Sequence, residues 1–391
     1  MPSVLEEAAL PVLVLKKSAL DNNLEVMARY AGGHGFVLAP HGKTTMAPAL
    51  FRRQLEAGAW GITVANMSQA LVAYGAGATR VVVANEVVGP VDARAMAEAL
   101  APGGRELYCL ADSVEGVSFL DRNLAATGVR GRLRVLVEVG APGSRAGVRS
   151  EEEGLGVARA VRDSPHLRLA GVEGFEGALA SDRSPGALAK VDGYLEGLRR
   201  FSLRLAGTGA LDGPGPAIVS AGGSKYFDRV ARVLGPGAAW GQARVLLVVR
   251  AGCYLLHDHG IYAGTSPLAG GGAGGAGLVP AMEVWAEVLS TPEPGLAIVG
   301  LGKRDASYDL GLPVPLHVVR GGTGPVEPLT EDALVRLDDQ HGYLQPGRGL
   351  RVGDRVGFGL SHPCTVFDKW RSALVVDDDY RVLERVETFF H

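Results

Sequence analysis

Hydrophobic residues in the first 260 positions alternate regularly between short β-branched runs and longer segments of helical composition. Runs that are apolar throughout are typical of parallel strands buried on both faces. The strands expected from these runs are 36–39, 61–65, 80–84, 106–111, 133–139, 169–175, 217–220 and 245–250. Helices are expected between them, including 47–57 and 150–162, and Ser113 and Ser150 are predicted to begin two of these helices.

Eight strand–helix units within about 215 residues predict an α/β protein with a (β/α)8 TIM-type barrel, which we place at residues 16–265. A doubly wound open sheet is the alternative. That fold usually carries a glycine fingerprint directly after its first strand, and residues 39–43 do not match it. The barrel is therefore the preferred prediction.

The pattern changes after residues 269–277, a glycine-rich tract that has the composition of a flexible loop. The later runs 282–288, 314–319 and 351–358 alternate between apolar and polar residues, as half-exposed antiparallel strands do. We expect a second, mostly antiparallel β domain over residues 266–391, with an early strand at 10–15 added to it.

Composition limits the classes of partner. The chain has 391 residues, 39 Lys and Arg against 42 Asp and Glu, and a net charge of −3, which argues against nucleic acid or an anionic membrane surface. Its apolar runs are far shorter than the ~20 residues that span a bilayer. Residues 1–10 do not resemble a signal peptide, and three cysteines are too few for a disulfide framework. A cytoplasmic protein with reduced thiols is expected.

Lys43 directly follows the first predicted barrel strand, at the rim where barrel enzymes place their reactive groups. A partly desolvated lysine beside another cation has a lowered pKa and can form a Schiff base. His41 is such a neighbour. A solvated loop lysine is the alternative interpretation of this position.

Gly222, Gly223 and Ser224 follow the seventh predicted barrel strand and precede a helical segment. Glycines let the backbone approach an anion, and free amides at a helix start favour phosphate. Many strand–helix loops have this composition, so the turn alone is weak evidence. Together with Lys43 it indicates a phosphorylated aldehyde held at both ends, which is pyridoxal 5′-phosphate (PLP).

His362 and Cys364 stand two residues apart on a segment expected to be extended, so their side chains project to the same side. Both are good zinc ligands. A structural zinc site needs four ligands, and the other cysteines lie more than 100 residues away. A metal bound here would therefore keep open positions for water or substrate, as catalytic sites do. An incidental pair is the alternative.

Residues 39–44 (Ala-Pro-His-Gly-Lys-Thr) resemble the Pro-His-x-Lys-Thr signature around the PLP lysine of the D-serine dehydratase and D-threonine aldolase family. Five further segments resemble the family: 143–147, 222–224, 250–254, 302–303 and 341–342. The His-x-Cys pair at 362–364 completes the set. The resemblance implies an alanine-racemase-like fold, a PLP-binding barrel followed by a β domain, and homodimers. Ala39 departs from the pattern, since members often have Arg there, and Thr44-Thr45-Met46 stands where they often have Thr-His-Lys.

Three more residues are candidates for the cofactor. Glu173 stands where similar dehydratases often have Tyr; it would hold the pyridine nitrogen protonated or pair with a nearby arginine. Arg145 would place a cation near the ring, or is a surface arginine. Tyr254 would donate its hydroxyl to the phosphate, or is a core tyrosine.

The resemblance implies a PLP- and zinc-dependent dehydratase (ammonia-lyase) that converts D-serine or a similar β-hydroxy D-amino acid to a 2-oxo acid and ammonia. Lys43 would remove the α-proton, and a metal on His362 and Cys364 would act as a Lewis acid on the β-hydroxyl. His41 and His341 are predicted to contact the substrate.

Two other functions remain open. An aldolase would cleave the same class of substrate to glycine and an aldehyde; members with that activity resemble His-x-Asp at the metal position, so Cys364 favours dehydration. A non-catalytic PLP carrier would use the same barrel, but such relatives lack the second β domain.

Overall fold

The computed structural model describes residues 3–130, 133–211, 215–270, 277–347 and 349–390, and most of the predicted glycine-rich loop (271–276) lies outside them. The chain divides into two compact units, which are described separately. The barrel unit comprises Ala28–Lys43 and Phe51–Gly252. The β unit comprises Met1–Met27, Thr44–Leu50 and Cys253–His391.

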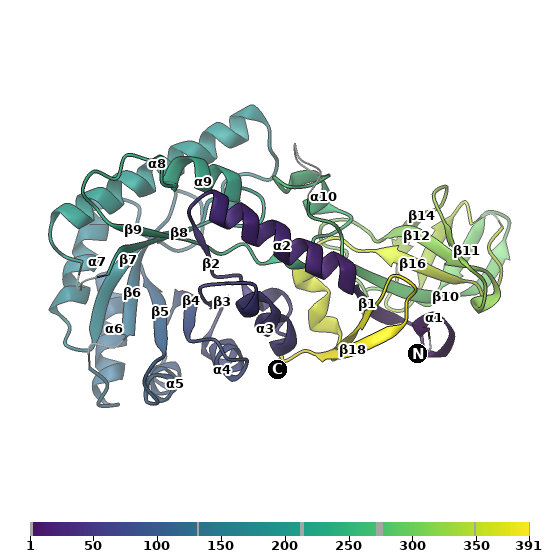
Figure 1. Cartoon of the computed structure of the whole chain (residues 1–391), viewed down its shortest axis with the longest axis horizontal. Helices are drawn as coiled ribbons and strands as arrows, with labels where there is room; N and C mark the ends of the chain where they lie inside the picture. The colour runs from purple at the N-terminus through teal and green to yellow at the C-terminus, as the bar shows by residue number, and fades with distance from the viewer. Residues whose placement is uncertain (1–2, 131–132, 212–214, 271–276, 348, 391) are drawn as a thin grey trace. The chain divides into compact units, whose positions relative to one another are not determined.

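The described part of the barrel unit contains eight parallel strands in the order β2-β9-β8-β7-β6-β5-β4-β3. Figure 1 shows this sheet curling within the unit. Its outer strands meet, because the Trp60 N–H donates to the Leu38 carbonyl (2.7 Å) and the Thr63 N–H to the Pro40 carbonyl (2.9 Å). The predicted barrel is confirmed. The strands are β2 (Val37–Leu38), β3 (Ile62–Val64), β4 (Arg80–Glu86), β5 (Glu106–Ala111), β6 (Leu133–Val139), β7 (Leu167–Gly174), β8 (Ala217–Ala221) and β9 (Val245–Val249).

Helices follow the strands as the alternation predicts. They are α4 (Met67–Gly75), α5 (Pro90–Leu100), α6 (Val114–Ala125), α7 (Glu151–Asp163), α8 (Pro185–Gly207) and α9 (Phe227–Leu234), while α2 (Lys17–Gly33) and α3 (Pro48–Glu56) belong partly to each unit. Ser113 accepts the Gly116 N–H at the start of α6, and Ser150 forms a capping box with Glu153 at the start of α7. Both predicted N-caps are confirmed.

Apolar side chains fill the inside of the barrel. Its buried core consists of Ala39, Val82, Tyr108, Leu110, Leu136, Ile218 and Val248. One glycine is required by this packing. Gly171 in β7 has φ +154°, and a Cβ there would lie 1.9 Å from the Ile218 carbonyl oxygen of β8. The close strand contact therefore excludes any larger residue.

The β unit is built on a sheet with the strand order β13-β12-β16-β10-β1-β17-β18, and β11, β15 and β14 extend it from β10. The early strand β1 (Val12–Lys16) pairs antiparallel with β10 (Met282–Glu293) and parallel with β17 (Ser372–Val376). The remaining strands are β11 (Leu296–Val299), β12 (Val314–Val319), β13 (Val326–Pro328), β14 (Ala333–Leu337), β15 (Gly342–Gln345), β16 (Arg355–Gly359) and β18 (Val382–Glu387). The sheet is mostly antiparallel, as predicted.

Short helical turns connect these elements. In the β unit they include α1 (Val4–Glu7), α10 (Ile261–Thr265) and the 3-10 turns η3 (Cys253–Leu255), η5 (Pro363–Thr365) and η6 (Phe367–Lys369). Across the described residues, the helices are all too short or too polar to span a bilayer.

Candidate active site

Lys43 lies in the 3-10 turn η1 (Gly42–Thr44), in the loop that follows β2 at the carboxyl end of the barrel strands, as predicted. The turn is held by close packing. A Cβ at Gly42 would lie 2.6 Å from the Phe51 ring, and one at Gly252 would lie 2.5 Å from the His41 carbonyl oxygen. Larger residues at Gly42 or Gly252 would therefore displace the packing around His41.

His41 is surrounded by cations. Burial lowers its pKa well below the ordinary histidine value, and the charges of Lys43, Arg250 and Arg145 lower it further. The imidazole is therefore neutral at neutral pH. Its Nδ1 is buried and has no hydrogen-bond partner. The fold thus brings four residues from distant parts of the barrel unit into one electropositive neighbourhood.

Glu173, near the end of β7, forms a buried ion pair with Arg250, which directly follows β9. Arg250 also donates to the Gly174 carbonyl (3.0 Å). Burial raises the pKa of Glu173, and Arg250 opposes that shift. Of the two functions predicted for Glu173, pairing with an arginine is observed. Its second oxygen, Oε2, and the Nε of Arg250 are buried without a hydrogen-bond partner.

A second carboxyl group lies next to Glu173. Glu138 of β6 is its partner in the β6–β7 register. Burial, a hydrogen bond with Glu86 and the charge of Glu173 raise the pKa of Glu138 to about 9, so this group is protonated at neutral pH. Glu86 Oε1 is also buried without a partner. Buried polar atoms lacking partners are rare, and this group of them fits the ring end of a polar cofactor such as PLP.

The predicted phosphate turn binds a carboxylate in this structure. The amides of Gly222 and Gly223 donate to Glu176 Oε2 (3.0 Å) and Oε1 (2.7 Å). Gly222 has φ +98°, and a Cβ there would lie 2.8 Å from the Val249 side chain. The backbone amides of the turn therefore hold an internal anion, and phosphate binding there stays a prediction. Ser224 follows it and is half-buried.

The other predicted cofactor residues are placed as follows. Arg145 is exposed, and its guanidinium lies 4.6 Å from the centre of the Phe175 ring. Its charge reaches His41, as described above. Tyr254 lies in η3 of the β unit and is buried. His341 is exposed in the turn before β15.

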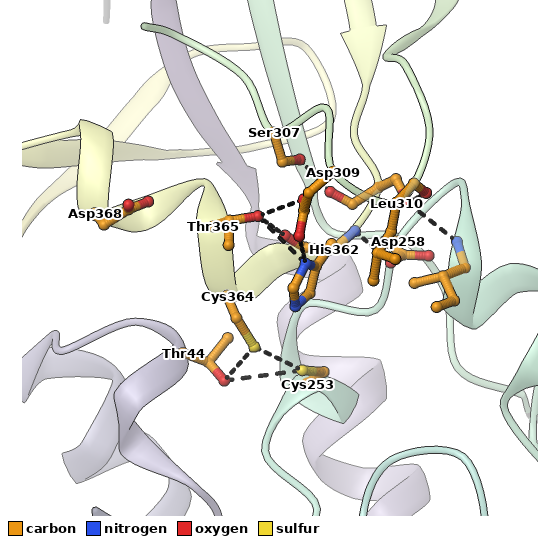
Figure 2. A network of polar contacts seen from close by, with 12 residues as sticks. Thr44, Cys253, Asp258, Ser307, Asp309, Leu310, His362, Cys364, Thr365 and Asp368 are labelled. Carbon is orange, nitrogen blue, oxygen red and sulfur yellow. Dashed lines mark hydrogen bonds and ion pairs between the residues drawn. The ribbon is translucent and has the colours of Figure 1, made fainter. Parts of the chain in front are cut away.

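His362 occupies a strained backbone position, and hydrogen bonds to the buried Asp258 maintain it (Figure 2). Its backbone is left-handed, with φ +50°, which is uncommon for a residue other than glycine. Its N–H donates to Asp258 Oδ2 (3.0 Å), and Asp258 Oδ1 accepts the N–H groups of Gly260 (3.0 Å) and Tyr262 (2.8 Å). The fully buried Asp258 therefore holds His362 in place.

The imidazole of His362 is oriented by Asp309. Nδ1 lies 2.6 Å from Asp309 Oδ2, and the Thr365 hydroxyl donates to Asp309 Oδ1 (2.9 Å). Burial alone would raise the pKa of Asp309, but the hydrogen bonds from His362 and Thr365 hold it below the ordinary value. With Nδ1 engaged, Nε2 is the ring nitrogen that can bind a metal, an arrangement typical of histidine ligands.

Cys364 lies beside a second cysteine, Cys253, that the sequence did not predict as a ligand. Its Sγ is 3.5 Å from Cys253 Sγ and 3.3 Å from the hydroxyl of Thr44 (Figure 2). Cys253 is buried in η3. It belongs to the segment 250–254, already noted for its resemblance to the family, and separation along the chain was the reason to discount it.

His362 and Cys364 are two of the ligands that a metal site would need. His362 and Cys364 offer a nitrogen and a sulfur, with Asp309 supporting the imidazole. Within the described ranges, however, no cluster of three or more His, Cys, Asp or Glu side chains is placed to hold an ion. His362 and Cys364 thus supply two ligands, one fewer than the three protein ligands of most catalytic zinc sites.

The chain is similar to known proteins along nearly its whole length. Residues 15–225 match the family described as alanine racemase, N-terminal domain, and residues 281–376 match the putative serine dehydratase domain. A D-threonine aldolase from an Arthrobacter species is 28% identical over 88% of this chain and 82% of the relative.

Two solved structures extend the comparison. The D-threonine aldolase of Filomicrobium marinum superposes with a TM-score of 0.81 at 25% identity, covering 97% of this chain and 95% of that one. The D-threo-3-hydroxyaspartate dehydratase of Delftia sp. HT23 has a TM-score of 0.78 at 22% identity, and each chain is fully covered. At 22% identity, the comparison with the dehydratase shows that the two proteins share a fold.

Proposed function

Because the chain belongs to the family of the alanine racemase N-terminal domain, together with the D-serine dehydratases and D-threonine aldolases, we propose that it is a zinc-dependent dehydratase of D-serine or a similar β-hydroxy D-amino acid. The predicted family and the prediction that the chain is a PLP-dependent lyase are confirmed. The reaction and the metal are our proposal.

Lys43 holds the cofactor and acts as the base in this proposal. The bound cofactor supplies a sink for the electron pair left on the α-carbon. The Lys43 amine takes the α-proton, and the neutral His41 beside it contacts substrate without adding a further positive charge. Glu173 Oε2 and His41 Nδ1, buried without partners, are the atoms that would orient the ring.

The single observation that carries the proposal is the contact between Thr44 and Cys364. Thr44 Oγ1 lies 3.3 Å from Cys364 Sγ, and Thr44 follows Lys43 by one peptide bond. A divalent ion on Cys364 and His362 would supply a Lewis acid for the β-hydroxyl, a poor leaving group by itself. Asp309 would keep the His362 Nε2 directed toward the ion.

The alternative is retro-aldol cleavage, which is favoured by the D-threonine aldolase relative at 28% identity. Product analysis separates the two. With D-serine and D-threonine we expect ammonia and a 2-oxo acid. Glycine together with acetaldehyde, without a 2-oxo acid, would overturn the dehydratase proposal and establish the aldolase.

The roles of lysine and metal are tested separately. Lys43→Ala should remove the visible absorbance of the lysine-bound cofactor and the activity. Chelation of the metal should remove activity but leave the absorbance of the lysine-bound cofactor unchanged. Added zinc should then restore the activity. Activity that persists after complete removal of metal contradicts the zinc proposal. A homodimer is part of the same proposal, and light scattering of the holoenzyme tests it.

A further inference from the structure

A cavity of about 360 Å³ lies in the barrel unit, lined by one face of α8, by the start of α7 and by the loop between β6 and α7. Its volume falls within the range of roughly 300–1,000 Å³ that is common for small-molecule sites. The mechanism proposed above uses none of its lining residues, so the cavity has no function assigned to it so far.

The interior of the cavity is mostly apolar. Lys190, Tyr194, Leu198 and Phe201 line it and follow one another at intervals of four, four and three residues, which places them on one face of α8. Leu198 and Phe201 are buried, as is Val148, which also lines the cavity. A hydrocarbon chain or an aromatic ring would therefore be removed from water here.

Gly197 keeps this face of α8 open. It lies in the interior of the helix, where glycine is less favourable than any residue except proline. Packing does not require a glycine at this position. A Cβ there would meet the tip of the Arg200 side chain, at 3.8 Å, and no closer atom of the described chain beyond the helix's own backbone. A larger side chain at residue 197 would instead occupy the cavity that Gly197 lines.

Two exposed cations, Lys190 and Arg200, also line the cavity. Neither forms an ion pair or a hydrogen bond with another residue in the part of the chain that the structure describes. Both are on α8, so their charges lie at the outer end of the apolar face. An apolar site with a polar rim is typical of a ligand-binding surface.

The other charged residues that are known to line the cavity already have partners. The Arg149 guanidinium donates to the backbone carbonyls of residues 144–147. Glu151 pairs with Arg204, at 2.7 Å. The charged groups that a ligand would meet are therefore the ammonium of Lys190 and the guanidinium of Arg200, and both attract a carboxylate.

Tyr194 connects this cavity to the strand ends of the candidate active site. Its hydroxyl donates to the carbonyl of Val139 (2.5 Å), the residue that follows Glu138. Burial and the charges of Glu173 and Glu176 raise the pKa of Tyr194. A ligand in the cavity would thus contact a side chain that borders these carboxyl groups, without entering the site that contains Lys43.

We propose that the cavity binds a small amphipathic carboxylate, a molecule with a linear or aromatic apolar body and one carboxylate group. The apolar interior would take the body, and Lys190 and Arg200 would attract the carboxylate. Burial of the apolar body supplies affinity, while the two cations select the charge of the ligand. The proposal does not depend on the reaction at Lys43.

The binding test uses the PLP-loaded enzyme, so that the cofactor site is filled. Octanoate and 3-phenylpropionate are titrated by calorimetry at constant ionic strength, and octanamide and 3-phenylpropanamide are their uncharged counterparts. We expect saturable binding of at least one carboxylate and weaker binding of the corresponding amide. The proposal fails if neither carboxylate saturates, or if the amides bind as tightly as the carboxylates.

Filling the cavity locates the bound molecule. Gly197→Leu should weaken binding at least tenfold, because the new side chain occupies the apolar volume. Its melting temperature should not fall below that of the parent, since leucine favours the helix more than glycine does. Gly193→Leu is the matched control, an exposed glycine of the same helix with open space around it, and should bind as the parent does. Unchanged binding by Gly197→Leu would place the ligand elsewhere and overturn the proposal.

The two cations are tested with substitutions at exposed positions, which do not depend on how Gly197→Leu folds. Lys190→Gln and Arg200→Gln should each weaken octanoate binding about threefold to fivefold, the effect of losing one exposed charge contact, and leave octanamide binding unchanged. Arg159→Gln, at an exposed arginine of α7, is the control. If both variants bind octanoate as the parent does, these cations do not hold the carboxylate and the proposal is wrong.

Discussion

Cys253 Sγ lies 3.5 Å from Cys364 Sγ, although 111 residues separate the two positions along the chain. The side chains of η3 and η5 thereby meet at the hydroxyl of Thr44. A disulfide has an S–S distance of about 2.05 Å, so a small shift of either side chain would allow one to form. The proposed metal ligand Cys364 therefore has a second thiol beside it.

Mild oxidation of the metal-free protein should link these cysteines. Hydrogen peroxide oxidises the Cys364 thiolate to a sulfenic acid, and the Cys253 thiol then attacks that sulfur and releases water. Peptide mapping should find the Cys253–Cys364 disulfide, reversible with dithiothreitol, and bound zinc should slow its formation. Cys109 is the internal control, because burial raises the pKa of its thiol to about 12. Oxidation of Cys109 before the pair contradicts this prediction.

Removing the carboxylate behind His362 should weaken metal binding. Asp309→Ala leaves Nδ1 of His362 without its 2.6 Å partner, and losing such a supporting group typically lowers metal affinity by about 10–100-fold. Competition with a chromogenic chelator measures the zinc affinity directly, without relying on turnover. Asp368→Ala, an exposed carboxylate in η6, serves as the matched control and should bind zinc as the parent does. Equal affinity in the two variants would argue against a metal on His362.

Glu176 should compete with the cofactor phosphate. Its carboxylate accepts hydrogen bonds from the amides of Gly222 and Gly223, which are the donors predicted for the phosphate. The carboxylate and the phosphate therefore cannot occupy these amides together. Glu176→Gln keeps an acceptor but removes the charge, and we expect about tenfold tighter binding of PLP, the effect of about 1.4 kcal/mol. Fluorescence titration of the apoprotein measures it. Glu115→Gln on α6 is the control, and weaker binding by Glu176→Gln would contradict the competition.

Folding stability should fall in mild acid. Burial lowers the pKa of His257 and of His259 to about 4, below the ordinary value of roughly 6.5 that applies in the unfolded chain. Between these two pKa values the unfolded chain binds more protons than the folded one. The free energy of unfolding therefore decreases as the pH falls through this window. Above about pH 6.5 the stabilising contribution of the two neutral histidines is complete.

Urea midpoints between pH 7 and pH 4 measure that loss. His257→Asn, chosen because His257 has a positive φ of 45° that Asn tolerates, should show a smaller loss than the parent. His34→Gln, at an exposed histidine in the turn after α2, should lose as much stability as the parent does. If His257→Asn also lost as much, the acid sensitivity would come from other groups.

Much of the barrel was predictable because its signals are local. The strands at 106–111 and 133–139 were predicted with the bounds that the structure has, since parallel strands buried on both faces are apolar throughout. The position of Lys43 followed from the same logic, as the loop after β2 lies at the carboxyl ends of the strands in any such barrel.

Which side chains surround each candidate site residue was not predictable, because it depends on contacts between segments that are distant along the chain. Asp309 stands 53 positions before His362, and no sequence pattern connects them. Arg250 pairs with Glu173 because β9 and β7 flank β8, which places both side chains at the same end of the barrel. Glu176 lies on the amides of Gly222 and Gly223, a contact that no motif predicted.

The order of apolar and polar residues by itself determined the eight barrel strands, the added β domain and the lysine at the end of the first strand, because each depends on neighbours within a few positions. Tertiary structure alone decided that Cys253 meets Cys364 and that Glu138 is the register partner of Glu173. The reason is physical: a pair's distance across the fold follows from strand order and register, which depend on the packing of the whole chain.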